Sequence, residues 1–178
     1  RFRVSLENFG VSTPTTELTN QVVDVTRPNV SFEDITVDVY NSRVYLAGKH
    51  TWEPVTLNLR EDVSNNVQKL VGEQLQKQFD FFEQSSAASG SDYKFVTRIE
   101  ILDGGNGINV ANVLETFELY GCYLQSANYN TLNYATNDPV TVALSIKYDN
   151  AIQTPQGTGV GTAVGRTVNT LITGGGST

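Results

Sequence analysis

The sequence has few of the residues from which catalytic and metal sites are built. It contains one cysteine, Cys122, one histidine, His50, and no methionine. A single cysteine can form neither a disulfide within the chain nor a cysteine-built zinc site. A serine or cysteine nucleophile would need His50 as its base, and the sequence has no His-x-x-x-His or Glu-x-x-His spacing for a metal site. We therefore expect no catalytic, cofactor or metal site, and we interpret Cys122 as a small buried residue and His50 as a polar loop residue.

The chain also has little positive charge and no long apolar run. It carries 12 Lys and Arg against 19 Asp and Glu, a net charge of −7. A protein that holds DNA or RNA tightly needs a basic surface, so this class is excluded. No stretch reaches the ~20 apolar residues of a membrane-spanning helix, and we expect a soluble protein without stable membrane anchoring. Because the sequence starts at Arg1, beside a strand-like run, and lacks methionine, we expect an N-terminal piece to be missing.

Two further motifs have simpler structural explanations than chemistry. The adjacent carboxylates Glu33-Asp34 and Glu61-Asp62 could act as acid and base in glycoside cleavage, but neighbouring strand residues point to opposite faces. Glu61-Asp62 also precedes a predicted helix, whose N-terminus favours negative charge. The run Gly104 to Gly107 contains Asn-Gly and lacks the Lys-Ser/Thr and helix of a phosphate-binding loop. It predicts a tight hairpin turn.

Most of the sequence alternates apolar and polar residues, as half-buried strands do. A turn is predicted over Gly10 to Thr16, and Arg27-Pro28-Asn29 predicts another. We count about seven or eight strands. The predicted strands are Phe2 to Leu6, Leu18 to Val25, Ile35 to Val39, Val44 to Gly48, Val55 to Leu59, Tyr93 to Leu102, Val113 to Leu124 (one long strand or a bent pair) and Val140 to Tyr148.

One segment has helical instead of alternating spacing. From Val63 to Phe82 apolar residues recur every three or four positions, which predicts one helix at about residues 63–83, capped by Ser64 or Asp62. The small residues Ser85 to Ser91 predict a surface loop after it. We thus expect a mainly β domain with one helix over residues 1–154. Residues 155–178 form a Gly/Thr-rich C-terminal arm, either disordered or ordered against a neighbouring surface.

The order of these parts resembles a known family. The run from Asn41 to Trp52 (NSRVYLAGKHTW) leads into the alternating strand at Val55, then an acidic turn at Asp62 and the helix. Tyr93-Lys94 introduces the later strands, and Val140 to Tyr148 closes the set. This ordered set resembles the tail tube protein of contractile-tailed, T4-like bacteriophages over roughly residues 2–150.

The resemblance implies an antiparallel β-sandwich or half-barrel protomer with a flanking helix. Six copies would form a ring whose strands join in a continuous inner β-barrel, and stacked rings would form the tail tube. The protein would be structural and not an enzyme. Its partners would be copies of itself and the tail sheath, baseplate and tail-terminator proteins, in the virion tail and, during assembly, in the host cytoplasm. DNA would touch it only in passing through the lumen, and an acidic wall would repel its phosphates.

Edge pairing is the expected mechanism of assembly, because a closed ring uses strand edges that would otherwise invite aggregation. Val113 to Leu124 and Val140 to Tyr148 are the candidate wall strands, and Ser85 to Ser91, Val11 to Thr16 and the arm are candidate stacking contacts. A specialised ring protein that initiates or terminates the tube fits the arm as well. Three alternatives stay open: the tube protein of a secretion or extracellular contractile injection system, a monomeric β-sandwich module that binds sugar or peptide through its tyrosines, and a hydrolase.

Overall fold

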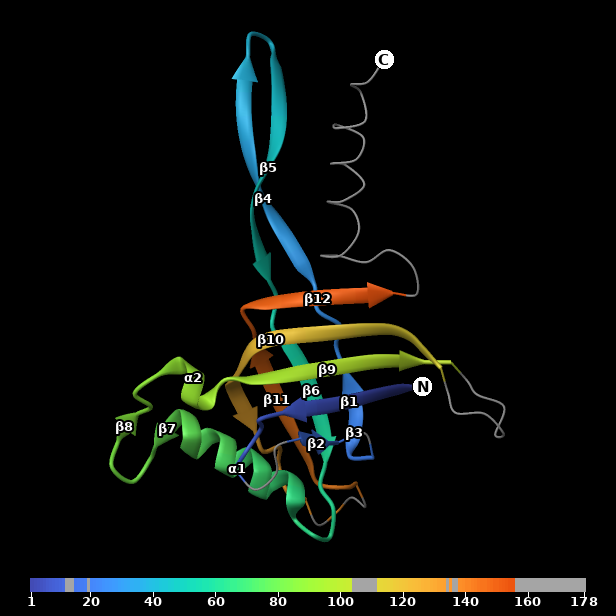
Figure 1. Ribbon diagram of the computed structural model, residues 1–178, viewed down its shortest axis with the longest axis vertical. Helices are drawn as coiled ribbons and strands as arrows, with labels where there is room; N and C mark the ends of the chain where they lie inside the picture. The colour runs from blue at the N-terminus through green and yellow to red at the C-terminus, as the bar shows by residue number, and fades with distance from the viewer. Residues whose placement is uncertain (12–14, 19, 104–111, 134, 136–137, 156–178) are drawn as a thin grey trace, which may run out of the picture.

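Two antiparallel sheets enclose the core of the protein. The computed structural model describes residues 1–11, 15–18, 20–103, 112–133, 135 and 138–155. The core strands form one hydrogen-bonded path, β2-β1-β9-β10-β11-β6-β3, with β12 beside β10. In Figure 1 the strands of the first sheet cross those of the second at a steep angle, as in orthogonal sandwiches. The bounds are β1 Phe2–Glu7, β2 Thr15–Glu17, β3 Val22–Val25, β6 Val55–Arg60, β9 Phe95–Leu102, β10 Val113–Asn128, β11 Thr141–Lys147 and β12 Asn150–Pro155.

Strand β10 belongs to both sheets. Its first part pairs with β9 and β12, and its last residues, from Tyr123, pair with β11. The bend lies at Gly121, whose φ of 67° favours glycine, and a Cβ there would overlap the carboxylate of Asp149. The same carboxylate accepts a hydrogen bond of 2.5 Å from Lys94 Nζ, and this bond raises the pKa of Lys94. The predicted long segment is therefore one bent strand.

Helix α1, Asn66–Gln78, closes one end of the sandwich. The buried amide of Gln74 accepts a hydrogen bond from the backbone of Gly10 and donates one to the carbonyl of Tyr93. The amide of Gln78 makes two bonds to the backbone of Leu124 (3.0 and 2.8 Å), where β10 has passed beyond β9. The helix thus satisfies backbone groups on three separate segments.

The helix is shorter than the predicted 63–83. Its N-cap is Asn65 and not Ser64 or Asp62, and the carboxylate of Glu61 instead accepts a hydrogen bond from the backbone N–H of Gln68 in the first turn. At the other end the chain becomes extended at Phe79. Asp80 then accepts bonds from the backbone of the next turn, which lower its pKa, so the apolar spacing continues into a turn and not a helix.

The loop after the helix contains more structure than predicted. Strand β7, Phe79–Asp80, pairs with β8, Ser85–Ser86. Helix α2, Gly90–Tyr93, is a single turn that begins inside the predicted small-residue loop and ends two residues beyond it, and a Ser89 capping box with Asp92 starts it. This turn uses the residue at which the next strand was predicted to begin, so β9 starts at Phe95.

Two further strand predictions need correction. Among the described residues of the predicted strand Leu18 to Val25, the strand covers Val22–Val25, because the carbonyl of Leu18 accepts hydrogen bonds from the backbone of Gln21 and Val22 in a turn. The predicted turn Gly10 to Thr16 runs into β2. Strand β12 was missed because its residues lack apolar alternation. The Gly104 to Gly107 turn and the arm beyond residue 155 lie outside the described residues.

A long two-stranded hairpin projects from the sandwich. It consists of β4, Val30–Val39, and β5, Ser42–Trp52, joined by Tyr40 and Asn41. Figure 1 shows it extending along the long axis, away from the sandwich and from α1. Both strands were predicted, but their alternation predicted half-burial, and every residue of β4 is exposed.

Candidate assembly interface

The hairpin carries an exposed apolar face. Ile35 lies opposite Leu46 and Val37 opposite Val44, and Val39 continues the same face towards the tip. Each of these five side chains is 42–52% exposed. We call them the hairpin apolar face. An isolated hairpin is marginally stable in water, and contiguous exposed apolar side chains mark an interaction site.

The opposite face of the hairpin is mainly polar. Asp34 and Thr36 lie on it, and Asp38 pairs across the strands with Arg43 at 2.8 Å (Nε to Oδ1). Surface pairs of this kind contribute little stability, so they fix the register more than they hold the hairpin together. The hairpin is therefore amphipathic, and no other described part of the chain lies over its apolar face.

Aromatic rings join the hairpin to the sandwich. The rings of Phe32, His50, Trp52 and Tyr148 follow one another with centroid separations of 6.3, 6.1 and 5.7 Å. Lys147 Nζ donates to the carbonyl of Trp52 at 2.9 Å, and burial raises the pKa of Tyr148 to about 12. The prediction of a loop at His50 is wrong, since it lies within β5 between two aromatic rings.

The other residues considered for chemistry have structural roles. Cys122 is fully buried, its thiol donates to the carbonyl of Leu119, and burial raises its pKa to about 11, which confirms it as a buried apolar residue. Glu33-Asp34 lies at a bulge in exposed β4, and Glu61-Asp62 organises the entry to α1. Within the described residues no three His, Cys, Asp or Glu gather as a metal site would require. No described helix is long and apolar enough to cross a membrane.

Within the described residues, three strands of the sandwich have a free edge, in addition to those of the two-stranded hairpins. The pairing path ends at β2 in one direction and at β3 in the other, and β12 pairs only with β10. Free edges offer backbone donors and acceptors to a further strand. These edges are where the predicted edge pairing would take place.

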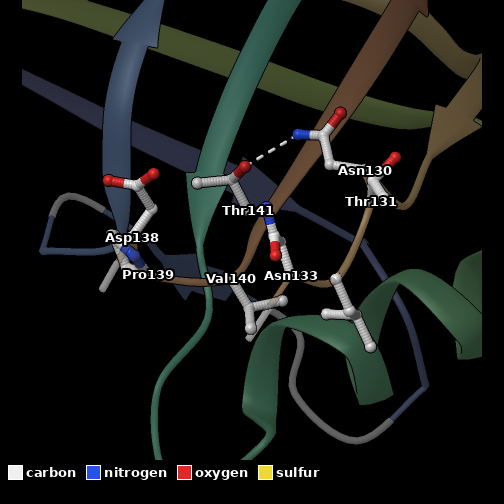
Figure 2. Close-up of a pocket in the computed structure, with 8 residues that line it drawn as sticks. Asn130, Thr131, Asn133, Asp138, Pro139, Val140 and Thr141 are labelled. Atoms are coloured by element: carbon white, nitrogen blue, oxygen red, sulfur yellow. Dashed lines mark hydrogen bonds between the residues drawn. The ribbon is translucent and has the colours of Figure 1, made fainter. Parts of the chain in front are cut away.

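A pocket of about 440 Å³ opens where β10 ends and β11 begins. Asn130 Nδ2 donates to Thr141 Oγ1 at 2.7 Å across it, and Asp138 lies on the other side (Figure 2). Leu132 and Val140 give it apolar surface and are both exposed. The connection from β10 to β11 lies at the end of the molecule opposite the hairpin (Figure 1).

Neither the hairpin tip nor this pocket was singled out from the sequence. The stacking candidates predicted from it were Val11 to Thr16, Ser85 to Ser91 and the arm. One signal was available: a two-residue hairpin turn normally takes Gly, Asn or Asp, and here it begins with Tyr40. A bulky aromatic residue at such a position is not explained by the conformation of the turn.

Comparisons with known proteins identify the fold. No family model and no curated protein matches the sequence. Among solved structures, a chain in the six-fold symmetrised cryo-EM structure of the anti-feeding prophage baseplate matches with a TM-score of 0.66 and 11% identity, covering 89% of this chain and 95% of that one. A chain in the sheath-tube complex of the extracellular contractile injection system PVC matches with a TM-score of 0.60 and 14% identity, covering 87% and 88%.

A crystal structure of Hcp protein also matches, with a TM-score of 0.54 and 10% identity, covering 89% of this chain and 94% of that one. At such identities the likeness concerns the fold. The prediction of a mainly antiparallel β protomer of the tail-tube type is confirmed.

Proposed function

We propose that this chain is a structural subunit of the tube of a contractile injection system. Copies close into rings of six, and the rings stack into a conduit. The hairpin apolar face is the observation that carries the proposal, because it forms a two-stranded unit with five exposed aliphatic side chains on a fold otherwise closed around its own core. The shared fold supports it, as does the predicted lack of a catalytic site.

Ring closure in this proposal uses strand edges, and stacking uses the hairpin. The candidate wall strands β10 and β11 are neighbours, each with one face in the core. The outward face of β11 carries three short uncharged side chains, Thr141, Ala143 and Ser145, and ends at Lys147, whose Nζ donates to the carbonyl of Trp52. Short uncharged side chains suit a wall along which cargo passes without being retained.

Two kinds of cargo fit the proposal. The bacteriophage resemblance favours a genome, and the net charge of −7 on each chain would keep the phosphates from being retained. The likeness to a chain of an extracellular contractile injection system favours protein cargo. In both cases the partners are sheath, baseplate and terminator proteins. For a phage, the location is the virion tail and, before that, the host cytoplasm.

Imaging of the purified full chain tests the proposal. We expect negative-stain microscopy to show six-fold rings and stacked tubes, and light scattering to show masses at multiples of six chains. A chain that stays monomeric at 19.5 kDa over a wide concentration range would contradict the proposal and support a monomeric binding module.

The cargo is tested separately on intact particles from the source organism. A phage tube predicts nuclease-protected DNA in the particles and capsid and packaging genes beside the coding gene. An extracellular injection system predicts particles without DNA that contain protein cargo. Either result leaves the tube proposal intact and decides between the two uses.

A further inference from the structure

The tip of the hairpin has an unusual conformation for its residue type. Tyr40 is the first residue of the two-residue turn, with φ of 50°, in the left-handed region that bulky residues rarely adopt. Its side chain is fully exposed. Glycine or asparagine would take this conformation at lower cost. A tyrosine that is strained and that no described residue covers indicates a function in contact with another molecule.

The pocket between β10 and β11 has the chemistry to receive a tyrosine side chain. Its volume of about 440 Å³ exceeds that of a phenol ring. Leu132 and Val140 offer apolar contact to the ring, and the side chains of Asn130, Asn133 and Asp138 offer partners to the hydroxyl. A buried tyrosine hydroxyl normally needs such a partner.

The two features lie at opposite ends of the molecule (Figure 1). A contact between two different surfaces of identical chains is heterologous, and it repeats without limit when the copies are translated along one direction. A contact between two hairpin tips would instead pair two copies and stop. Opposite ends are therefore the arrangement that an open stack requires.

We propose that Tyr40 of one copy binds in the pocket lined by Leu132, Asp138 and Val140 of a copy in the next ring. The inference rests on the proposed tube function and assigns its stacking contact to specific residues. The hairpin apolar face then lies along the neighbouring ring, and Tyr40 sets the axial register. Tyrosines buried at the centre of an interface commonly contribute a large part of its affinity.

Disulfide trapping between separately made variants tests this contact. One preparation carries Tyr40→Cys and the other Leu132→Cys, and the two are mixed, assembled and mildly oxidised. We expect a crosslinked dimer on a non-reducing gel only in the mixture. Cys122 stays in place, because it is buried and its thiol pKa is raised, and the unmodified chain measures its background.

A matched control uses another exposed aromatic residue. Phe82 is exposed on the turn between β7 and β8, in neither the hairpin nor the pocket. A mixture of Tyr40→Cys with Phe82→Cys should give no crosslink above background. Crosslinking of Tyr40→Cys with itself would indicate contact between two tips and would overturn the inference.

A second measurement separates docking from folding. Tyr40→Gly relieves the strained φ, so the variant should unfold at the same or higher urea concentration than the unmodified chain. Its critical concentration for tube assembly should nevertheless rise about tenfold or more, as loss of an interface anchor predicts. Phe82→Gly should leave that concentration within about twofold.

The outcomes distinguish the inference from the proposed function. Tubes that form normally with Tyr40→Gly and give no Tyr40–Leu132 crosslink overturn the inference and leave the tube function standing. An unmodified chain that forms neither rings nor tubes overturns both. Crosslinking together with the tenfold rise supports the assigned contact.

Discussion

Strands β6 and β4 have the same apolar alternation and opposite environments. Val55, Leu57 and Leu59 of β6 are 0% exposed, whereas Ile35, Val37 and Val39 of β4 are 42–50% exposed. Strand β6 lies between β11 and β3 and faces the core, but β4 pairs only with β5, which is equally exposed. Alternation thus predicts which residues share a face of a strand, but it does not predict which surface covers that face. For β6 the chain supplies that surface, and for β4 we propose that another copy does.

The largest expected effect comes from truncating the same residue type in both environments. Leu57→Ala leaves a cavity in the core and should lower the free energy of unfolding by about 2–5 kcal/mol. Leu46→Ala on the hairpin apolar face should change it by less than about 1 kcal/mol, because the side chain is already half in water. Urea unfolding of both variants under non-assembling conditions measures the difference.

Equal losses for the two variants would contradict this comparison. They would mean that the hairpin apolar face is covered within the single chain. An unchanged dependence of unfolding free energy on urea concentration checks that both variants unfold from the same compact state.

The sequence predicted best those segments whose apolar side chains pack on the core of the same chain. The alternations at Phe2, Val55 and Val140 and the helical spacing from Val63 each correspond to an element that packs on the core. In these segments local propensity and burial act in the same direction. The fold class followed from them.

The ends of the helices and strands and the candidate interface were predicted less well from the sequence, for physical reasons. The end of α1 depends on Asp80 accepting hydrogen bonds from the next turn, and β12 pairs with the edge of β10 that precedes the bend at Gly121. Both causes are tertiary contacts and leave little trace in periodicity. The alternation of the hairpin apolar face predicted half-burial, but no described residue of the chain covers that face.

The bend at Gly121 allows a second comparison, between two glycines. Gly121→Ala places a Cβ against Asp149 in a left-handed backbone and should cost about 1–2 kcal/mol from conformation alone. Gly72→Ala in α1 meets nothing within 4 Å and should stabilise the protein by up to about 1 kcal/mol. Thermal unfolding measures both, and a neutral Gly121→Ala would show that the bend does not depend on glycine.

The smallest expected change in stability is the most informative about function. Val37→Thr keeps a β-branched side chain at a strand position that is 42% exposed, so the free energy of unfolding should change by less than about 0.5 kcal/mol. If the hairpin apolar face lies against another copy, the hydroxyl enters an apolar contact and the critical concentration for tubes should rise several-fold. Thr36→Val makes the reverse change on the opposite face and should leave assembly unaltered. Sedimentation of tubes over a concentration series separates the two variants, and equal effects from both would show that the two faces of the hairpin are not distinguished during assembly.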